Sequence, residues 1–196
     1  MALPGLEIRR RIFHLVCGVI IVGLINYDFL DSKIAAILLV LLVVLGIIIK
    51  KVKVPVAYWF FKKFDRPKDF KKMPGKGAIF YLVGVILVLT IFPKDIAMAS
   101  ILILALGDSI APIVGQYGSI ESPWNKKKYI EGSIAGAVIG GIGAMLFVGP
   151  LEAVLAAIAA MIAEGVGLKI GVNPLDDNIV MPIVAGAVML LLRFLI

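Results

Sequence analysis

The sequence predicts an all-α fold built from membrane-spanning helices, on the basis of its composition, its long apolar runs and the placement of its charges. Hydrophobic residues make up 61% of the 196 residues and charged residues only 17%, whereas soluble domains have roughly 45–50% and about 25%. The excess lies in long runs, and backbone polar groups inside hydrocarbon must be satisfied within their own segment. These runs are therefore expected to be helices.

Seven segments approach the length needed to cross a hydrocarbon core about 30 Å thick. They are residues 12–30, 33–49, 77–93, 95–115, 131–149, 151–167 and 179–196. The loops between them are either very short or long and polar, and the long ones cover about 50–76, 116–130 and 168–178. With seven spans, the three long loops lie on the same side as the N-terminus. We expect 1–196 to form a single integral-membrane domain.

Lysine and arginine are divided unequally between the two sides. Seventeen of the twenty lie on the N-terminal side, and the other side holds only Lys33, Lys94 and Arg193. Positive residues accumulate in cytoplasmic loops. The sequence therefore predicts a multi-pass protein of the cell membrane, with the N-terminus, the long loops and the active site facing the cytoplasm. The charge of +7 reflects this topology, and no nucleic-acid partner is expected.

Segment 50–75 mixes aromatic residues such as Tyr58, Trp59 and Phe60 with lysines. This pattern suits a helix that lies in the membrane interface, with rings at headgroup level and cations near anionic lipid. A basic loop that only sets topology is the alternative. Further along, Gly132, Gly136 and Gly140 recur every four residues, a spacing that favours close helix packing.

Asp108 and Glu164 are acids inside predicted spans. Asp108 follows Lys94 by fourteen residues and Glu164 follows Pro150 by fourteen, so at about 1.5 Å per residue each lies ~21 Å from the outer edge. Two carboxylates at one depth on different helices could share a cation or a proton, and intramembrane acids are functional candidates. Snorkelling to the interface, or a bond to a neighbouring helix, is the structural alternative.

The sequence around Asp108 reads GDSIAPIVG at 107–115. Pro112 removes a backbone donor one turn after the acid, while Gly107 and Gly115 permit close backbone approach. A disturbed helix at membrane depth is tolerated only where it is buried or lines a wet cavity. The motif predicts a polar pocket that opens toward the cytoplasm.

Three lysines, Lys126–Lys128, precede the helix start that contains Glu131 and Ser133. Free N–H groups and the helix dipole favour anions at such a position, so a phosphate site is predicted. The alternatives are a topological lysine anchor and, for Glu131, a helix-capping acid.

Asp176, Asp177 and Asn178 stand together at the start of the last span. One helix cap needs a single such residue, and adjacent oxygen ligands suit Mg²⁺ that carries nucleotide phosphates. A metal or nucleotide contact is therefore predicted, with simple capping as the alternative.

Basic residues at two other helix starts are further candidates. Arg10 and Arg11 enter the first span, where His14 shares a helix face with Arg10; the arginines also fit simple topological anchors, and His14 fits a hydrogen-bonded interface residue. Lys76 lies in PGKG at 74–77, which is not a phosphate-binding P-loop because Phe70 and Gly77 stand where Gly and Ser or Thr are needed. Lys76 could still meet phosphate.

Together these segments resemble the family of dolichol kinases, phytol kinases and CTP-dependent diacylglycerol kinases. The matching segments, spread in family order over nearly the whole chain, are EIRRRIFH at 7–14, PGKGAIFY at 74–81, GDSIAPIVG at 107–115, KKYIEGS at 127–133, and Glu164 with LDDNIVMP at 175–182. Arg10 and Arg11 match the family's basic pair, with Arg11 in place of its usual lysine. Asp108, Lys128, Glu131 and the 176–178 triplet match its other motifs.

The resemblance implies transfer of the CTP γ-phosphate to a lipid alcohol in the membrane, with CDP and a lipid phosphate as products. We assign Mg²⁺ to Asp108 with Asp176 or Asp177. Contacts to the nucleotide or its phosphates are assigned to Arg10, Arg11, Lys76, Lys128, Ser133 and Asn178. Glu131 or Glu164 would orient or deprotonate the alcohol, so that Asp108, Glu131 and Glu164 form the catalytic set.

The lipid is expected to be a polyprenol such as dolichol. One Gln and four Asn, beside many Lys, Ile and Val, are compatible with a thermophile, and an archaeal host would favour a polyprenol over diacylglycerol. Two other functions stay open. One is a CDP-lipid synthase such as a CDP-archaeol synthase, and the other is a transporter in which Asp108 and Glu164 relay protons or cations. A homo-oligomer is also possible.

Overall fold

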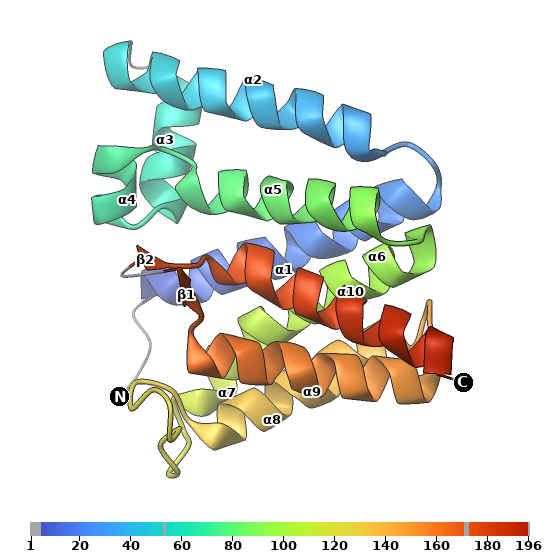
Figure 1. Cartoon of the computed structure of the whole chain (residues 1–196). Helices are drawn as coiled ribbons and strands as arrows, with labels where there is room; N and C mark the ends of the chain where they lie inside the picture. Colours follow the sequence, from blue (N-terminus) through green and yellow to red (C-terminus); the bar gives the residue numbers. More distant parts are fainter. Residues whose placement is uncertain (1–4, 53, 171–172, 196) are drawn as a thin grey trace.

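Helices make up most of the chain that the structure, a computed structural model, describes, which is residues 5–52, 54–170 and 173–195 (Figure 1). They are α1 (Gly5–Asn26), α2 (Ser32–Lys51), α3 (Pro55–Phe64), α4 (Pro67–Lys72), α5 (Lys76–Ile91), α6 (Lys94–Leu102), the π-helical turn η1 (Ile103–Gly107), α7 (Asp108–Gly115), α8 (Ile130–Ala144), α9 (Pro150–Val166) and α10 (Asp177–Leu195). Strand β1 (Lys169–Ile170) pairs antiparallel with β2 (Asn173–Pro174). The all-α class is confirmed.

Local sequence signals set several helix ends. Asp31 caps α2, because its carboxylate accepts the N–H of Ile34 at 2.8 Å. Pro150 occupies the first turn of α9, where its missing N–H removes no helical bond. Helix α9 ends at Val166, and the capping residue Gly167 has a φ of 65°, in the left-handed region that glycine adopts without strain. This turn leads the chain into the β1–β2 hairpin.

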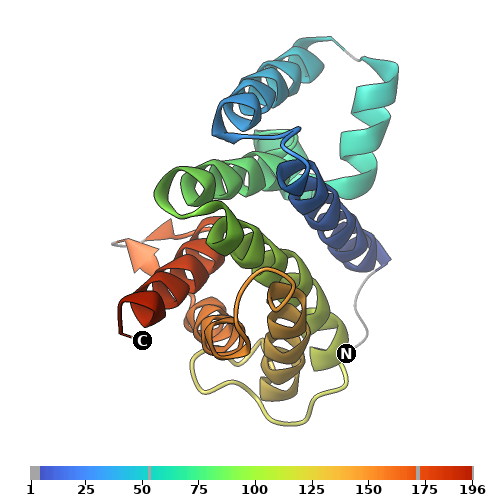
Figure 2. The same cartoon turned by 90° about the vertical axis from the view of Figure 1, so that its right-hand side faces the viewer.

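A central rod of α6, η1 and α7 runs without interruption over Lys94–Gly115. In its most apolar 18-residue window 78% of the residues are buried, because α1, α5, α8, α9 and α10 pack around it. Figure 2 shows the rod crossing the middle of the molecule. Helix α2 packs mainly on α5 and forms one outer edge (Figure 1). The side chains of the rod are therefore largely surrounded by other helices.

Small residues let α8 approach the rod closely. A Cβ added to Gly136 would lie 2.9 Å from the carbonyl oxygen of Gly107, a distance too short for any larger side chain to be accommodated without movement. Gly132 and Gly140 face the rod in the same way. The packing role predicted for this glycine stripe is confirmed.

Apolar side chains cover much of the outer surface. Three helical segments of the described chain are long and apolar enough to cross a membrane: α2, the Lys94–Gly115 rod and α10. Helices α5 and α8 are apolar but shorter, with 16 and 15 residues. Large exposed hydrophobic side chains follow α1, α2, α8 and α9, a surface that suits lipid rather than water. The chain is a membrane protein, and crossing by all seven predicted segments stays a prediction.

The two ends of the bundle differ in their connections (Figure 1). The start of α1, the α3–α4 segment, the loop 116–129 and the β1–β2 hairpin lie at one end, which we call the polar end. The short turns 27–31, 92–93 and 145–149 lie at the opposite end. The expectation that the long loops share one side is confirmed.

Segment 50–75 forms two short helices rather than one. Arg66 has an extended backbone with φ −65° and ψ 142°, because Pro67 disfavours helical geometry in the residue before it. Rings of α3 pack on α1, with Phe13 centred 5.3 Å from Phe60 and 4.9 Å from Phe64. The segment therefore folds back over the polar end of α1.

Candidate active site

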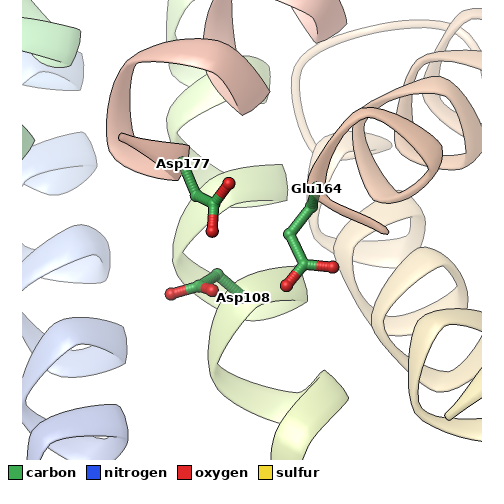
Figure 3. A group of neighbouring side chains, drawn as sticks. All are labelled: Asp108, Glu164 and Asp177. Atoms are coloured by element: carbon green, nitrogen blue, oxygen red, sulfur yellow. The ribbon is translucent and has the colours of Figure 1, made fainter. Parts of the chain in front are cut away.

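Three carboxylates from three helices meet inside the polar end. Asp108 begins α7, Glu164 lies in the last turn of α9 and Asp177 begins α10 (Figure 3). One oxygen atom of each lies within 4.8 Å of the others. The side chains of Asp108 and Glu164 are only 13% and 7% exposed. The two acids placed at one depth by residue counting therefore do meet, and a third joins them.

The backbone around Asp108 is irregular on both sides. The π-turn η1 precedes it, and such turns are frequent at functional sites because they rotate the side chains that follow. Pro112 follows one turn later and has no N–H to donate to the Asp108 carbonyl oxygen. That carbonyl instead accepts Nη1 of Arg11 at 2.8 Å. The missing helical bond thus creates an acceptor for a side chain of α1.

Arg11 joins α1 to this helix start. Its guanidinium also donates to the Asp108 carboxylate, while Ser109 Oγ donates to the Arg11 carbonyl oxygen at 3.0 Å. His14, one turn further along α1, places Nε2 3.9 Å from Asp108 Oδ2. Asp108 is therefore held by Arg11 through its carboxylate and through the carbonyl oxygen that Pro112 leaves without a helical donor.

Lys128 makes the matching contact on the other side of the cluster. Its Nζ donates to the Glu164 carboxylate and, at 2.7 Å, to the Glu164 carbonyl oxygen, so it also satisfies an end carbonyl of α9. The same Nζ lies 4.0 Å from Asp177 Oδ2. Two cations, Arg11 and Lys128, thus neutralise a cluster of three acids. If a metal ion bound the acids instead, both side chains would be available to bind phosphate.

The other residues at the start of α10 have different positions. Asp176 Oδ1 accepts the backbone N–H of Asn178 at 3.1 Å and its side-chain Nδ2 at 2.7 Å. Asp176 thus holds the first turn of α10 and does not join the group of three carboxylates. Asn178 lines a cavity on the α1 side of the cluster.

Glu131 and Lys76 lie away from the cluster. Glu131 Oε1 accepts the N–H groups of Ser119 and Ile120 at 2.7 and 3.0 Å, and therefore holds the loop before α8. Lys76 Nζ lies 4.0 Å from Asp69 and 5.7 Å from the centre of the Phe80 ring. The structure does not bring either side chain to the three acids.

Arg10 pairs with Glu7 at 3.1 Å on the same helix. Glu7 also accepts Nε of Arg66 at 2.8 Å, and this bond, with the nearby positive charges, holds the pKa of Glu7 below its usual 4.5. The pair ties the α3–α4 segment to the start of α1.

Two cavities flank the Arg11–Asp108 contact. The first, of about 270 Å³, lies between α1, α3 and α5 and has mostly apolar walls; we call it the apolar cavity. The second, of about 490 Å³, is lined by Arg11, Lys126, Lys127, Lys128, Ser133 and Glu164 among others; we call it the basic cavity. Arg11 lines both, Asp108 the first and Glu164 the second. The carboxylate cluster therefore connects an apolar site to a cationic one.

Comparison with known proteins identifies relatives along most of the chain. No family model and no solved structure matches it. An uncharacterized protein of Methanocaldococcus jannaschii is 31% identical over 92% of this chain and 91% of its own length. The CTP-dependent diacylglycerol kinase 1 of Schizosaccharomyces pombe is 30% identical over 64% of each chain. A protein named "Probable phytol kinase, chloroplastic" from Triticum aestivum is 28% identical over 60% of this chain and 44% of its own.

The chain belongs to the phytol and CTP-dependent diacylglycerol kinase family. The matches to the two named kinases cover less than two thirds of the length of each. The family resemblance that the sequence motifs indicated is confirmed.

In this member of the kinase family, the three acids present a donor set that suits Mg²⁺, a hard cation that takes carboxylate oxygens. One carboxylate oxygen of each acid lies within 4.8 Å of the other two. Small side-chain movements would therefore let Asp108, Glu164 and Asp177 hold one ion.

Sequence reasoning missed Tyr81 and the apolar cavity that it lines. Tyr81 is 5% exposed, and its ring lies edge-on to His14 with centres 4.6 Å apart. The sequence did contain a signal for Tyr81: its hydroxyl lies within an apolar span, near the end that carries the other polar motifs. Its significance depends on the facing helix, which the sequence does not place.

Proposed function

We propose that this chain transfers the γ-phosphate of CTP to the hydroxyl group of a lipid alcohol. The observation that carries the proposal is the position of the carboxylate cluster between the basic cavity and the apolar cavity. Phosphoryl transfer requires an in-line approach of a hydroxyl to a phosphate whose charge is neutralised. Arg11, which lines both cavities, stands at the place where those two substrates would meet.

The basic cavity is proposed to hold the nucleotide phosphates. Lys126, Lys127 and Lys128 supply positive charge there, and Ser133 in the first turn of α8 supplies a hydroxyl. The N–H groups that begin α8 favour an anion. By their names, one of these relatives uses CTP and another acts on phytol. The choice of CTP as phosphate donor rests on this similarity and not on a contact to the cytosine ring.

Asp108, Glu164 and Asp177 would hold Mg²⁺. When bound, the ion would offset the negative charge of the transferring phosphate. Arg11 and Lys128, which now pair with two of these acids, would turn their donors toward phosphate. Asp108, the member of the cluster that also lines the apolar cavity, would orient the substrate hydroxyl and receive its proton as the new P–O bond forms and the bond to CDP breaks.

The polar end is proposed to face the cytoplasm, with seven segments crossing the membrane. Seventeen of the twenty Lys and Arg residues lie on that side, which supports the orientation. A polyprenol is the proposed acceptor. Its support is the likeness to a phytol kinase, whose substrate by name is an isoprenoid alcohol, and to an archaeal protein over nearly the full chain.

The test is phosphate transfer by detergent-purified protein from γ-labelled CTP or ATP, with Mg²⁺, to polyprenols, short isoprenoid alcohols and diacylglycerol. Formation of a labelled isoprenoid phosphate together with CDP supports the proposal. Preferential labelling of diacylglycerol would make that lipid the acceptor in place of a polyprenol. Pyrophosphate release when a lipid phosphate is supplied would replace it with a CDP-lipid synthase. Silence in both assays, with cation flux in proteoliposomes, would replace it with a transporter.

A further inference from the structure

The walls of the apolar cavity come from helices on three sides. Its apolar surface is made by Phe13 and Ile21 of α1, Phe60, Phe61 and Phe64 of α3, and Leu82 of α5. Its polar groups gather where α1 meets the cluster, around Arg11, His14 and Asp108. Arg11 and Ile21 are ten residues apart on one helix, about 15 Å at 1.5 Å per residue. The cavity therefore has one polar end and a long apolar flank.

Three residues that line this cavity each carry a buried polar atom with no hydrogen-bond partner among the described residues: His14 Nε2, the Tyr81 hydroxyl and Asn178 Oδ1. Buried polar groups in native proteins are nearly always paired, so an unpaired one calls for an explanation. Asn178 Oδ1 can only accept, whereas the tyrosine hydroxyl can donate. An alcohol hydroxyl complements both, because it donates one proton and accepts through its lone pairs.

The size of the cavity limits what it can enclose. At about 270 Å³ it is at the small end of ligand pockets, which measure roughly 300–1,000 Å³. It can take the hydroxyl end of a lipid but not a whole long chain. Beyond it, Val56 and Trp59 on the outer face of α3 are exposed apolar side chains, so the rest of a chain that leaves past α3 meets an apolar surface.

We propose that the apolar cavity between α1, α3 and α5 is the acceptor site, which binds the hydroxyl end of a single-chain lipid alcohol. The hydroxyl lies against Tyr81, His14 and Asn178, beside Asp108, and the first carbons lie among the phenylalanine rings of α1 and α3. The proposal rests on the proposed kinase function for the identity of the second substrate, but the site itself is tested without phosphate transfer.

Cys17 provides the test, because it lines this cavity and is the chain's one cysteine. The rate of maleimide labelling of purified protein is measured with geranylgeraniol, with its methyl ether, and with CTP plus Mg²⁺. A ligand at ten times its Kd leaves roughly a tenth of the sites free, so geranylgeraniol should slow labelling about tenfold. The ether, which cannot donate to Asn178, should protect less, and CTP should not protect.

A matched protein moves the thiol to the basic cavity. In the double variant Cys17→Ser, Ser133→Cys the order reverses: CTP with Mg²⁺ slows labelling and geranylgeraniol does not. In Tyr81→Phe, with Cys17 retained, protection weakens for both the alcohol and the ether, because the oxygen of each accepts the proton of the Tyr81 hydroxyl. Cys17→Ser alone measures background labelling.

Equal labelling of Cys17 with and without saturating alcohol would overturn the assignment, as would protection by CTP alone. A diazirine-bearing isoprenoid alcohol gives a readout that needs no thiol: cross-links are expected on α1, α3 and α5, and cross-links confined to α8 and the loop before it would also overturn the assignment. Alcohol protection in a protein that transfers no phosphate would keep the binding site and reject the kinase.

Discussion

Both ends of the helix bundle contain acids paired with bases, but they differ in what surrounds the pairs. At the end opposite the polar end, Arg193 of α10 donates to Asp95 of α6 at 2.6 Å and to Glu152 of α9 at 3.0 Å. One arginine there satisfies two acids on two helices. At the polar end three acids face two cations, and the contacts border both cavities.

This difference indicates that the Arg193 contact is structural and that the contacts at the polar end belong to a reactive site. The Arg193 contact is partly exposed, with side-chain exposures of 33% for Arg193 and 39% for Asp95, and lines neither of the two described cavities. Exposed pairs contribute little stability. At the polar end Asp108 and Glu164 are more buried, at 13% and 7% exposed, whereas Asp177 is 38% exposed. Burying charges without a functional return is costly. Matched substitutions at the two ends therefore distinguish chemistry from stability.

The largest effect is expected from Asp108→Asn, compared with Asp95→Asn. Loss of the Asp108 carboxylate removes a metal ligand worth several kcal/mol, so kcat/KM should fall on the order of 10²-fold or more. Asp95→Asn should leave kcat/KM unchanged and lower Tm slightly. Steady-state transfer from CTP and thermal unfolding in detergent measure the two. Full activity in Asp108→Asn would remove it from the metal site.

A smaller effect is expected from Lys128→Gln, compared with Arg193→Gln. A hydrogen bond to a charged group contributes about 1.5–3 kcal/mol, so the Kd for CTP should rise roughly 10- to 100-fold if Lys128 turns to phosphate. Arg193→Gln should bind CTP as the wild type does. Equilibrium binding of labelled CTP decides. An equal loss in both variants would mean that the polar-end contact is also structural.

Pro112→Ala should give opposite effects on stability and activity. Alanine restores an N–H that competes with Arg11 for the Asp108 carbonyl oxygen, so kcat/KM should fall by roughly tenfold or less. The helix itself should gain stability, because proline is about 3 kcal/mol worse than alanine in a helix interior. A higher Tm with unchanged activity would show that the proline only shapes the backbone.

The smallest expected effect concerns Glu7, which ties the α3–α4 segment to α1. Its pKa is lowered from 4.5 in the folded protein, so the stability that it contributes is present above about pH 4.5 and is lost as pH falls through the folded pKa. Because the Arg66 side chain is half exposed, we expect the pair to contribute about 1 kcal/mol or less.

The measurement for Glu7 is the difference in Tm between the wild type and Glu7→Gln, at neutral pH and near pH 3.5. The wild type should be more stable at neutral pH, and the difference should shrink in acid. A difference that does not change with pH would assign it to packing rather than to charge.

Residue counting along a helix predicted some of the site and missed the rest. The spacing of Asp108 and Glu164 from their helix starts placed them at one depth, since rise per residue is nearly constant. Counting did not separate Asp176 from Asp177, because adjacent residues on a helix point about 100° apart and the direction of the cluster was not known. Sequence reasoning also kept Glu131 and Lys76 as candidate site residues, because membership of a motif does not show which groups a side chain contacts.

The sequence by itself determined that the chain is helical and lives in a membrane, that its long basic loops share one end, and which family it resembles. These properties follow from composition, run length and local motifs, which need no knowledge of neighbouring helices. Only the tertiary structure decided that Asp108, Glu164 and Asp177 converge, that Asp176 caps α10, and that Tyr81 packs edge-on against His14 beside the apolar cavity. Those contacts depend on how each helix is rotated about its axis, and that rotation is set by packing between helices distant in sequence.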